Sequence, residues 1–358
     1  MSKVLVPDYF ERFVCKCGVC RHPCCDGWGI NVSKAEYFSL IGLDCTEKLR
    51  HRIDDAFVVS DFPTDESYAS IQPNFLEQCP MLDEDGLCML QKEKGEHLLP
   101  LICRVYPRGV KKYGENHEIC MSCSCEETVE LLMQSTKPLL PHETTVDLPF
   151  EGLEVYGDEP EKDELRHKCV LIMSEPGESI TERLEKIGLL CGGKPQGAAE
   201  SRKQSLVSVK HFIEILCRRS KSIREYGEKA LSFLDCGEDE MMCRFDEAEE
   251  HLYKVIPKVE AYAGRIIANH LIYESFPYVD GCETPDSAFA AFCTAVALLK
   301  VMCVCGMADT DDIDVFTDIL SFANRFIEHS DYYRTCSRLS HPEGMKVFAL
   351  FKPILEKN

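Results

Sequence analysis

Polar and apolar residues alternate with the period of an α-helix through most of the C-terminal part of the 358-residue chain. One example begins at Ser179-Ile180-Thr181-Glu182, a capping box, after which Leu184, Ile187 and Leu190 recur at helical spacing. Similar patterns predict further helices around His211 and near 225–235, 247–276, 284–307, 311–328 and 343–356. Since strand and helix patterns do not alternate along the chain, we expect no parallel sheet.

The N-terminal third has shorter elements and more turns. A capping box at Ser33 predicts a short helix over 33–40, and a second helix is expected over 126–133. The sequence Asp-Glu-Asp-Gly at 83–86 is typical of a turn, and we expect it to join 79–82 and 87–90 as a β-hairpin.

Composition changes between these two parts. Four prolines, at 138, 141, 149 and 160, interrupt any helix there and suit an extended connector. We therefore predict a mainly α fold with three parts: an irregular cysteine-rich metal-binding module with a short hairpin (1–135), a proline-rich linker (136–160) and an α-helical bundle (161–358).

One apolar stretch, 288–307, approaches the length needed to cross a membrane. Lys300 interrupts it and acidic residues follow it, so we expect a buried bundle helix, with peripheral membrane contact left open. The net charge of −21 argues against nucleic acid as a partner, because an acidic surface repels phosphate. The first residues do not form a signal peptide, which favours a cytoplasmic, reducing location.

Cysteines are concentrated at the N-terminus, where 12 of the 22 lie within the first 125 residues. A chain of this length does not need disulfides to replace a core, and thiols stay reduced or bind metal in the cytosol. Thiolates bind zinc, copper(I) and iron–sulfur clusters. The spacing alone leaves iron–sulfur and zinc both open.

The remaining cysteines, and the histidines at 22, 211 and 270, follow no ligand motif, so we expect them to be structural. The motifs of nucleotide-binding Rossmann folds, P-loops, zinc proteases and α/β-hydrolases are absent, as is the radical S-adenosylmethionine spacing Cys-x3-Cys-x2-Cys. A conventional Rossmann-type methyltransferase or dehydrogenase is therefore disfavoured.

Several short motifs resemble those of the flagellin lysine-N-methylases. They are Tyr9-Phe-Glu-Arg-Phe-Val-Cys15, Cys20-Arg-His-Pro-Cys-Cys-Asp-Gly-Trp28, Cys79-Pro-Met-Leu-Asp83 with Gly86-Leu-Cys88, Ile102-Cys-Arg-Val-Tyr-Pro-Arg108, Ser124-Cys-Glu-Glu127, Ala268-Asn-His-Leu-Ile-Tyr273 and Phe276-Pro-Tyr278. Glu126 stands where proline is usual in the family. The Cys-Cys and Cys-Arg-x-Tyr-Pro elements also occur in a broader group of zinc- or iron-chelating proteins.

The resemblance implies a cytoplasmic enzyme that transfers a methyl group from S-adenosyl-L-methionine to the ε-amine of flagellin lysines. It also implies a [4Fe-4S] cluster, with zinc as the alternative. The implied ligand candidates are Cys15, Cys20, Cys24, Cys25, Cys79, Cys88, Cys103 and Cys125. These are twice as many thiols as one cluster takes.

A methyl acceptor lysine must first lose a proton, which from a pKa of about 10.4 costs roughly 4.6 kcal/mol at pH 7. Tyr106 and Tyr273 are candidates for the base only by their motif positions. Two other classes stay open: a non-enzymatic zinc- or iron-chelating protein, and a zinc-stapled interaction module.

Overall fold

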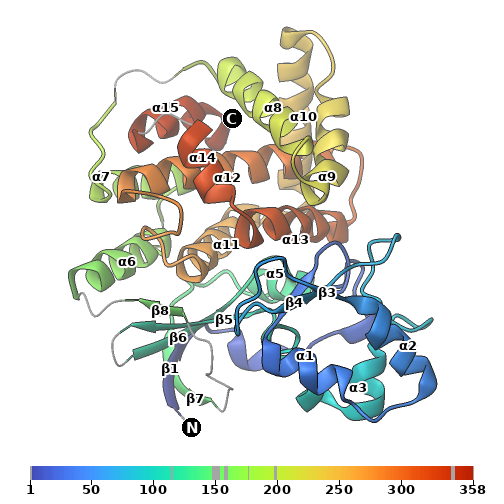
Figure 1. The fold of residues 1–358 in the computed structure, drawn as a ribbon. Helices are drawn as coiled ribbons and strands as arrows, with labels where there is room; N and C mark the ends of the chain where they lie inside the picture. The colour runs from blue at the N-terminus through green and yellow to red at the C-terminus, as the bar shows by residue number, and fades with distance from the viewer. Residues whose placement is uncertain are drawn as a thin grey trace. The chain divides into compact units, whose positions relative to one another are not determined.

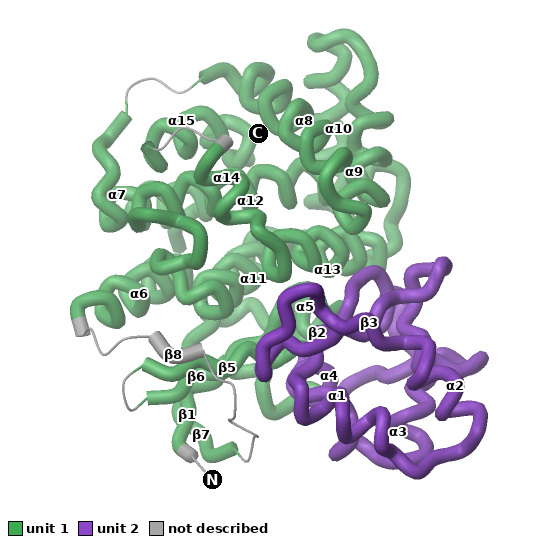
Figure 2. Tube along the Cα trace, in the orientation of Figure 1, with its two compact units in different colours: residues 1–13, 107–358 green, residues 14–106 purple. Residues whose placement is uncertain are grey.

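The computed structural model describes residues 2–113, 116–146, 154–156, 160–175, 177–196, 200–339 and 343–357. It has two compact units: unit 1 is formed by 1–13 and 107–358, and unit 2 by 14–106 (Figures 1 and 2). The described residues form fifteen α-helices and eight short strands, which confirms the mainly α class. The units differ from the predicted parts because the first strand of the chain and the residues after 107 share one sheet.

Unit 1 contains a five-stranded sheet in the order β7-β1-β6-β5-β8. Its strands are β1 (Ser2–Val6), β5 (Arg108–Tyr113), β6 (Asn116–Met121), β7 (His142–Val146) and β8 (Glu154–Tyr156). β1 runs parallel to β6, and β5 runs parallel to β8, so the expectation of no parallel sheet was wrong. β1 and β6 are far apart in the sequence, and β6, α5 and β7 lie between β5 and β8, so neither parallel pair produces a repeated strand–helix pattern. Both β7 and β8 lie in the stretch predicted as a linker.

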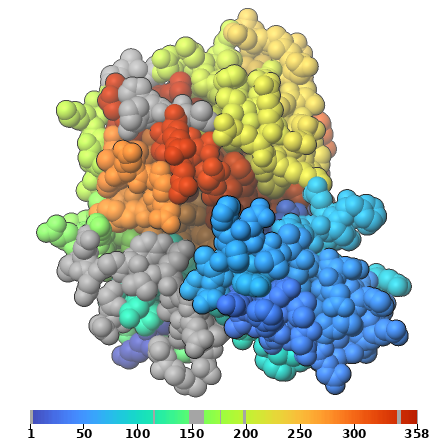
Figure 3. All heavy atoms as spheres, viewed as in Figure 1, coloured from blue at the N-terminus to red at the C-terminus, as the bar shows by residue number. Residues whose placement is uncertain are grey.

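All the helices of unit 1 except α5 follow the strands of the sheet along the chain. They are α5 (Glu126–Met133), α6 (Pro160–Met173), α7 (Ile180–Leu190), α8 (Arg202–Cys217), α9 (Lys221–Phe233), α10 (Glu238–Val255), α11 (Val259–Tyr273), α12 (Pro285–Gly306), α13 (Ile313–His329), α14 (Tyr332–Leu339) and α15 (Gly344–Leu355). α8 packs against α9 and α10, and the side chains of these helices form one continuous surface (Figure 3).

Helix α12 is the centre of the bundle and packs against α15, α13, α14 and α9 (Figure 1). By length and composition it is the one helix in the described part of the chain that could cross a membrane, and 89% of its apolar window is buried inside the protein. The expectation of a buried core helix is therefore confirmed. Its start is fixed by a capping box between Thr284 and Ser287, with Pro285 at the first helical position.

The helix ends follow local chemistry. The Ser179 side chain accepts a hydrogen bond from the Glu182 backbone N–H, and the Glu182 carboxylate accepts one from Ser179 N, which confirms the predicted capping box. The single helix predicted over 247–276 was wrong, because the chain breaks between α10 and α11 at Pro257. Proline has no backbone N–H and its ring collides with the preceding turn.

Unit 2 combines four short helices with a three-stranded antiparallel sheet. The elements are β2 (Ile30–Val32), α1 (Lys34–Ile41), α2 (Glu47–Ala56), β3 (Phe57–Val59), β4 (Ala69–Ile71), α3 (Met89–Lys94) and α4 (Leu101–Val105), and the strand order is β2-β4-β3. The fully buried side chains of Leu49, Ile53 and Leu90 form part of its small core. The predicted capping box at Ser33 is confirmed.

The predicted hairpin in unit 2 is largely wrong. The turn at 83–86 is present, with Gly86 at a φ of 75° that favours glycine, but the only strand-like pairing around it in the described residues is the bridge between Leu82 and Cys88. The second predicted strand is instead the start of α3 at Met89. The apolar residues that follow the turn therefore have helical geometry and point into the core of unit 2.

Candidate functional site

Five of the eight candidate ligands share Cys24 as a neighbour in unit 2. A hydrogen bond to the Cys24 thiol, together with burial, raises the pKa of Cys25. Burial, together with the neighbouring thiols of Cys88 and Cys24, raises the pKa of Cys79 to about 11. Burial is also the main cause that raises the pKa of the Cys15, Cys88 and Cys103 thiols, and Cys24 is among the neighbouring groups that add to the rise. The structure therefore gathers thiols from three separate segments of unit 2.

Backbone pairing holds these segments together. The Cys79 N–H donates to the Cys25 carbonyl at 2.7 Å, and an isolated bridge joins Asp26 to Gln78. The only tryptophan, Trp28, donates its indole N–H to the Cys24 carbonyl at 2.8 Å. The vicinal pair Cys24–Cys25 is thus fixed against the segment that carries Cys79.

Several of the sulfur atoms accept hydrogen bonds from nearby backbone N–H groups. The Cys17 N–H lies 3.4 Å from the Cys15 sulfur. Backbone N–H groups two residues further along also point at Cys79 and Cys88, where they oppose the rise in pKa. Such N–H groups stabilise thiolates in metal and iron–sulfur sites. The number of thiols and their hydrogen bonds therefore fit a thiolate-bound metal or cluster.

The thiols do not form a coordination shell. Among the residues that the structure describes, no group of three or more Cys, His, Asp or Glu side chains is arranged to hold a metal ion. Cys125, the last of the eight candidates, belongs to unit 1 and caps α5. Cys20 lies in the loop after a short 3-10 helix at Cys17–Val19 and is half-buried. All 22 cysteines are free thiols.

A second polar cluster lies in unit 1, and we call it the Glu328 network. Its members come from the turn after β6 and from α11, α13 and α14: Ser122, Ser124, His270, Glu328, His329 and Tyr333. The Glu328 carboxylate accepts from Ser122 at 2.5 Å and lies 3.0 Å from His270 Nδ1. His270 Nε2 lies 2.6 Å from the Tyr333 hydroxyl.

The network carries buried charge. The Glu328 side chain is fully buried. Burial acts to lower the pKa of His270, but the hydrogen bond and charge of Glu328 outweigh burial and raise it. His329 Nε2 lies 2.8 Å from the Ser124 hydroxyl, and loss of water around the ring lowers its pKa. Glu328 belongs to no sequence motif, and His270 was expected to be structural. Their partners come from elements that are far apart in the chain, so local patterns did not reveal the network.

Asn269, beside His270 on α11, fixes the same region. Its side-chain N–H₂ donates to the Met121 carbonyl at 2.8 Å and to the Cys123 sulfur at 3.3 Å. Its side-chain oxygen accepts from the Tyr9 hydroxyl and, at 3.1 Å, from the Cys120 thiol. The spacing Cys120-x2-Cys123 thus serves the packing of unit 1 around one amide.

The two tyrosines considered as bases lie in different units. Tyr106 in unit 2 packs its ring edge-on against Trp28 at 5.9 Å. Tyr273 in unit 1 lies edge-on to His329 at 6.1 Å, and its backbone carbonyl accepts from Lys111. Both rings thus have an aromatic neighbour, and the Lys111 ammonium lies 5.6 Å from the centre of the Tyr273 ring.

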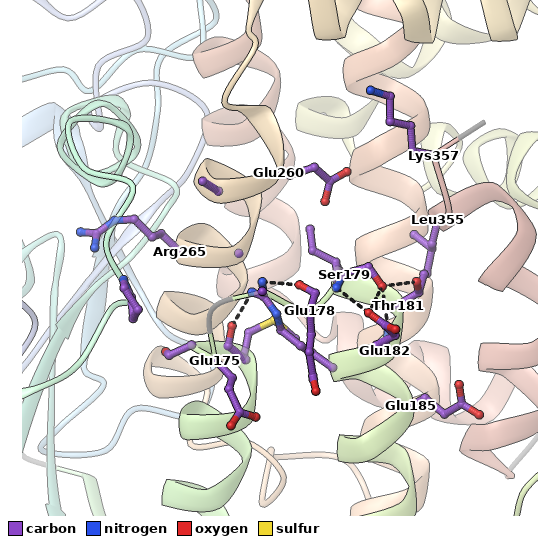
Figure 4. A pocket seen from close by; sticks show the side chains of 18 of the residues that line it. Glu175, Glu178, Ser179, Thr181, Glu182, Glu185, Glu260, Arg265, Leu355 and Lys357 are labelled. Carbon is purple, nitrogen blue, oxygen red and sulfur yellow. Dashed lines mark hydrogen bonds between the residues drawn. The ribbon is translucent and has the colours of Figure 1, made fainter.

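Unit 1 also contains an open cavity of about 1110 Å³ (Figure 4). It is lined by the start of α7, one face of α11, the end of α15 and residues 136–139. Glutamates and lysines or arginines both contribute to its lining. A cavity of this size is large enough for a small molecule of cofactor size.

Comparison with known proteins agrees with the motifs. Two proteins named lysine-N-methylase, from Salmonella typhimurium and Salmonella choleraesuis, are 28% and 27% identical to this chain over 144 residues, which are 40% of this chain and 35% of each relative. The flagellar biosynthetic protein FliU of Salmonella muenchen is 29% identical over 132 residues, 36% of this chain and 76% of FliU. The aligned region thus spans about a third of the lysine-N-methylases' length.

No family model matches the chain, and no solved structure matches it. The similarity of this helical protein with an inserted cysteine-rich unit therefore rests on relatives found by sequence, and not on a known fold. Those relatives confirm its similarity to the flagellin lysine-N-methylase family.

Proposed function

We propose that this protein is a protein-lysine N-methyltransferase that takes its methyl group from S-adenosyl-L-methionine and acts on flagellin in the cytoplasm. The observation that carries the proposal is the similarity to two proteins named lysine-N-methylase. The name of FliU and the cysteine and Asn-His motifs described above support the flagellar substrate.

The second part of the proposal is a [4Fe-4S] cluster held by thiols of unit 2. Cys24, Cys79, Cys88 and Cys103 are the favoured quartet, because Cys24 is a neighbour of the other three thiols, Cys79 and Cys88 are neighbours of Cys103, and all four come from a single unit. Four thiolates complete such a cluster, which when bound supplies one-electron chemistry. Cys15 and Cys25 would then be neighbours of the ligands.

The acceptor amine places one demand on the chain's own residues. A lysine side chain is protonated at neutral pH, and removal of its proton costs roughly 4.6 kcal/mol. A site that removes water from the ammonium group lowers this cost, since desolvation disfavours the charged form. The residues lining the site would therefore act by shielding and orienting the amine.

Anaerobic purification followed by a transfer assay tests both parts. The expected protein is brown, contains iron and sulfide, and transfers label from S-adenosylmethionine to flagellin lysines. Cys88→Ser should lose the colour and the iron, whereas Cys243→Ser, at an exposed thiol of α10, should keep both.

Two results would reject the proposal in separate ways. Cluster-loaded protein that transfers no methyl group to flagellin would reject the enzyme for this substrate. A colourless protein with stoichiometric zinc would reject the cluster and favour a zinc-stapled interaction module or a chelating protein.

A further inference from the structure

Strand β3 (Phe57–Val59) ends the three-stranded sheet of unit 2 and has an open edge. In the part of the chain that the structure describes, it pairs with β4 alone, in antiparallel register (Figure 1). The Ser60 N–H donates to the Tyr68 carbonyl at 3.0 Å. At the other end, the Gln72 N–H donates to the Ala56 carbonyl at 3.0 Å. The pairing with β4 therefore extends one residue beyond each end of β3.

This register decides which backbone groups face outwards. Hydrogen-bonded and non-bonded residue pairs alternate along an antiparallel ladder. Because Ala56 and Ser60 bond across the ladder and Val58 lies midway between them, Val58 also directs its N–H and C=O groups at β4. The N–H and C=O groups of Phe57 and Val59 point the other way, at the open edge. An added strand can bond these outward groups.

The side chains around this edge are apolar and accessible. Val58 is 54% exposed, Val59 42% and Phe62 90%. The position of Phe62 is supported by a local bond, since its N–H donates to the Ser60 hydroxyl at 3.2 Å. Proteins commonly protect edge strands with lysine or proline, because an apolar open edge favours pairing with another strand. β3 itself contains neither residue.

The charge around the edge is negative. Residues 54–66 contain four aspartates and one glutamate but no lysine or arginine. Two of these acids pair with cations of α1 and α2. Among the described residues, no cation lies within ion-pair distance of Asp55, Asp61 or Glu66. Two copies of this edge would repel each other, whereas a strand that carries lysines complements it.

The acids lie at both ends of the apolar strand. Asp55 is two residues before β3, in the last turn of α2, and Asp61 is two residues after it. A strand advances by about 3.3 Å per residue, so an extended segment of about seven residues matches this length. The ligand that fits has an apolar centre and a lysine towards each end.

We propose that the open edge of β3 binds an extended, lysine-containing segment of the acceptor protein as a fourth strand, an inference that rests on the methyltransferase activity proposed above. The backbone groups of Phe57 and Val59 bond the added strand. The Val58 side chain contacts its apolar centre. The carboxylates of Asp55 and Asp61 attract its lysines. The edge thus selects acceptor segments that are extended and basic.

Fluorescence anisotropy with the intact, anaerobically purified protein tests the site without any methyl donor. The probe is the labelled peptide Lys-Thr-Val-Thr-Val-Thr-Lys. The same peptide with glutamate at both ends should bind at least about tenfold more weakly. Two further peptides are N-methylated on all valines or on all threonines. Since alternate N–H groups of a strand face opposite edges, one of these two peptides should lose binding and the other should keep it.

Matched protein variants locate the binding on β3. Val59→Pro removes an outward N–H that β4 does not use, and should weaken the lysine probe at least about tenfold; Val59→Thr keeps that N–H and should bind within about threefold of the wild type. Asp55→Asn/Asp61→Asn should weaken the probe about threefold to tenfold. Glu247→Gln/Glu250→Gln, at exposed positions of α10, makes the same change of charge and should bind as the wild type. Far-UV circular dichroism checks that each variant is folded.

The other outcomes overturn the inference. Wild-type protein that does not bind the lysine probe, equal binding of both N-methylated peptides, or full binding by Val59→Pro would exclude strand addition at β3. A dimer that Val59→Pro disrupts, without peptide binding, would assign the edge to a second copy of the chain.

A transfer assay separates this inference from the proposed function. Val59→Pro should raise the KM for the acceptor protein and leave kcat unchanged. An unchanged KM would show that the acceptor does not use the edge, and would leave the proposed function standing. Failure of the proposed function appears instead as absent methyl transfer by the cluster-loaded wild type.

Discussion

Asn269 provides the sharpest test of how unit 1 is held together. The residue is completely buried, and its amide links Tyr9 near the start of the chain to the Met121 carbonyl at the end of β6. Asn269→Leu preserves the volume approximately but removes these hydrogen bonds. The Tyr9 hydroxyl and the Met121 carbonyl would then stay buried, and each would lack the hydrogen bond that it makes with the Asn269 amide.

The expected size follows from those two groups. Each buried polar group left without a partner costs about 1–3 kcal/mol, so Asn269→Leu should lower the free energy of unfolding by about 2–6 kcal/mol. Tyr9→Phe removes one of the stranded groups. The double variant Tyr9→Phe/Asn269→Leu should therefore be more stable than the sum of the single effects by about 1–2 kcal/mol.

Urea denaturation of the reduced protein, followed by far-UV circular dichroism, measures these differences. Asn116→Leu, at an exposed position of β6, is the control and should change stability little. A loss below about 0.5 kcal/mol for Asn269→Leu, or strict additivity with Tyr9→Phe, would refute the argument that this amide connects the two segments.

Three further predictions concern charge and capping in unit 1. Glu118→Leu leaves Arg166, 2.6 Å away and equally buried, without its closest carboxylate; this should cost about 3–5 kcal/mol in chemical denaturation, and adding Arg166→Met should recover most of it. His270 has a raised pKa in the folded state, so its pairing with Glu328 stabilises fully below the unfolded value of about 6.5 and fades as pH rises through the folded value; the stability difference between wild type and Glu328→Gln should therefore shrink as pH rises above about 6.5, and a constant difference would contradict this. Ser179→Ala removes the N-cap side chain of α7 and should lower the free energy of unfolding by about 1 kcal/mol, measured by thermal denaturation. An unchanged transition would count against the capping role.

Local signals in the sequence were sufficient for several elements. The boxes at Ser33 and Ser179 fixed two helix starts, because both partners lie within four residues of each other. The helix predicted over 126–133 has those bounds in the structure. The same reasoning failed at Pro257, where the apolar period continues on both sides of a residue that ends the helix.

Long-range pairing was beyond local patterns. β1 and β6 are separated by the whole of unit 2, and nothing in either strand specifies the partner. The Glu328 network has the same character, since Ser122, His270 and Glu328 come from three elements and only the tertiary fold brings them together. The thiols of unit 2 were predicted from their density, whereas which of them are neighbours depended on backbone pairing between Cys25 and Cys79.

Unit 2 is an insertion within unit 1, and its two connections leave from neighbouring points: the Arg108 guanidinium lies 5.0 Å from the ring of Phe13. This order has a consequence for synthesis on the ribosome. All residues of unit 2 have been translated once synthesis reaches position 106, whereas β6 and β7, the strands that pair with β1, have not yet been synthesised. Since domains fold as units during translation, the inserted unit can finish folding while the first strand of its host remains unpaired.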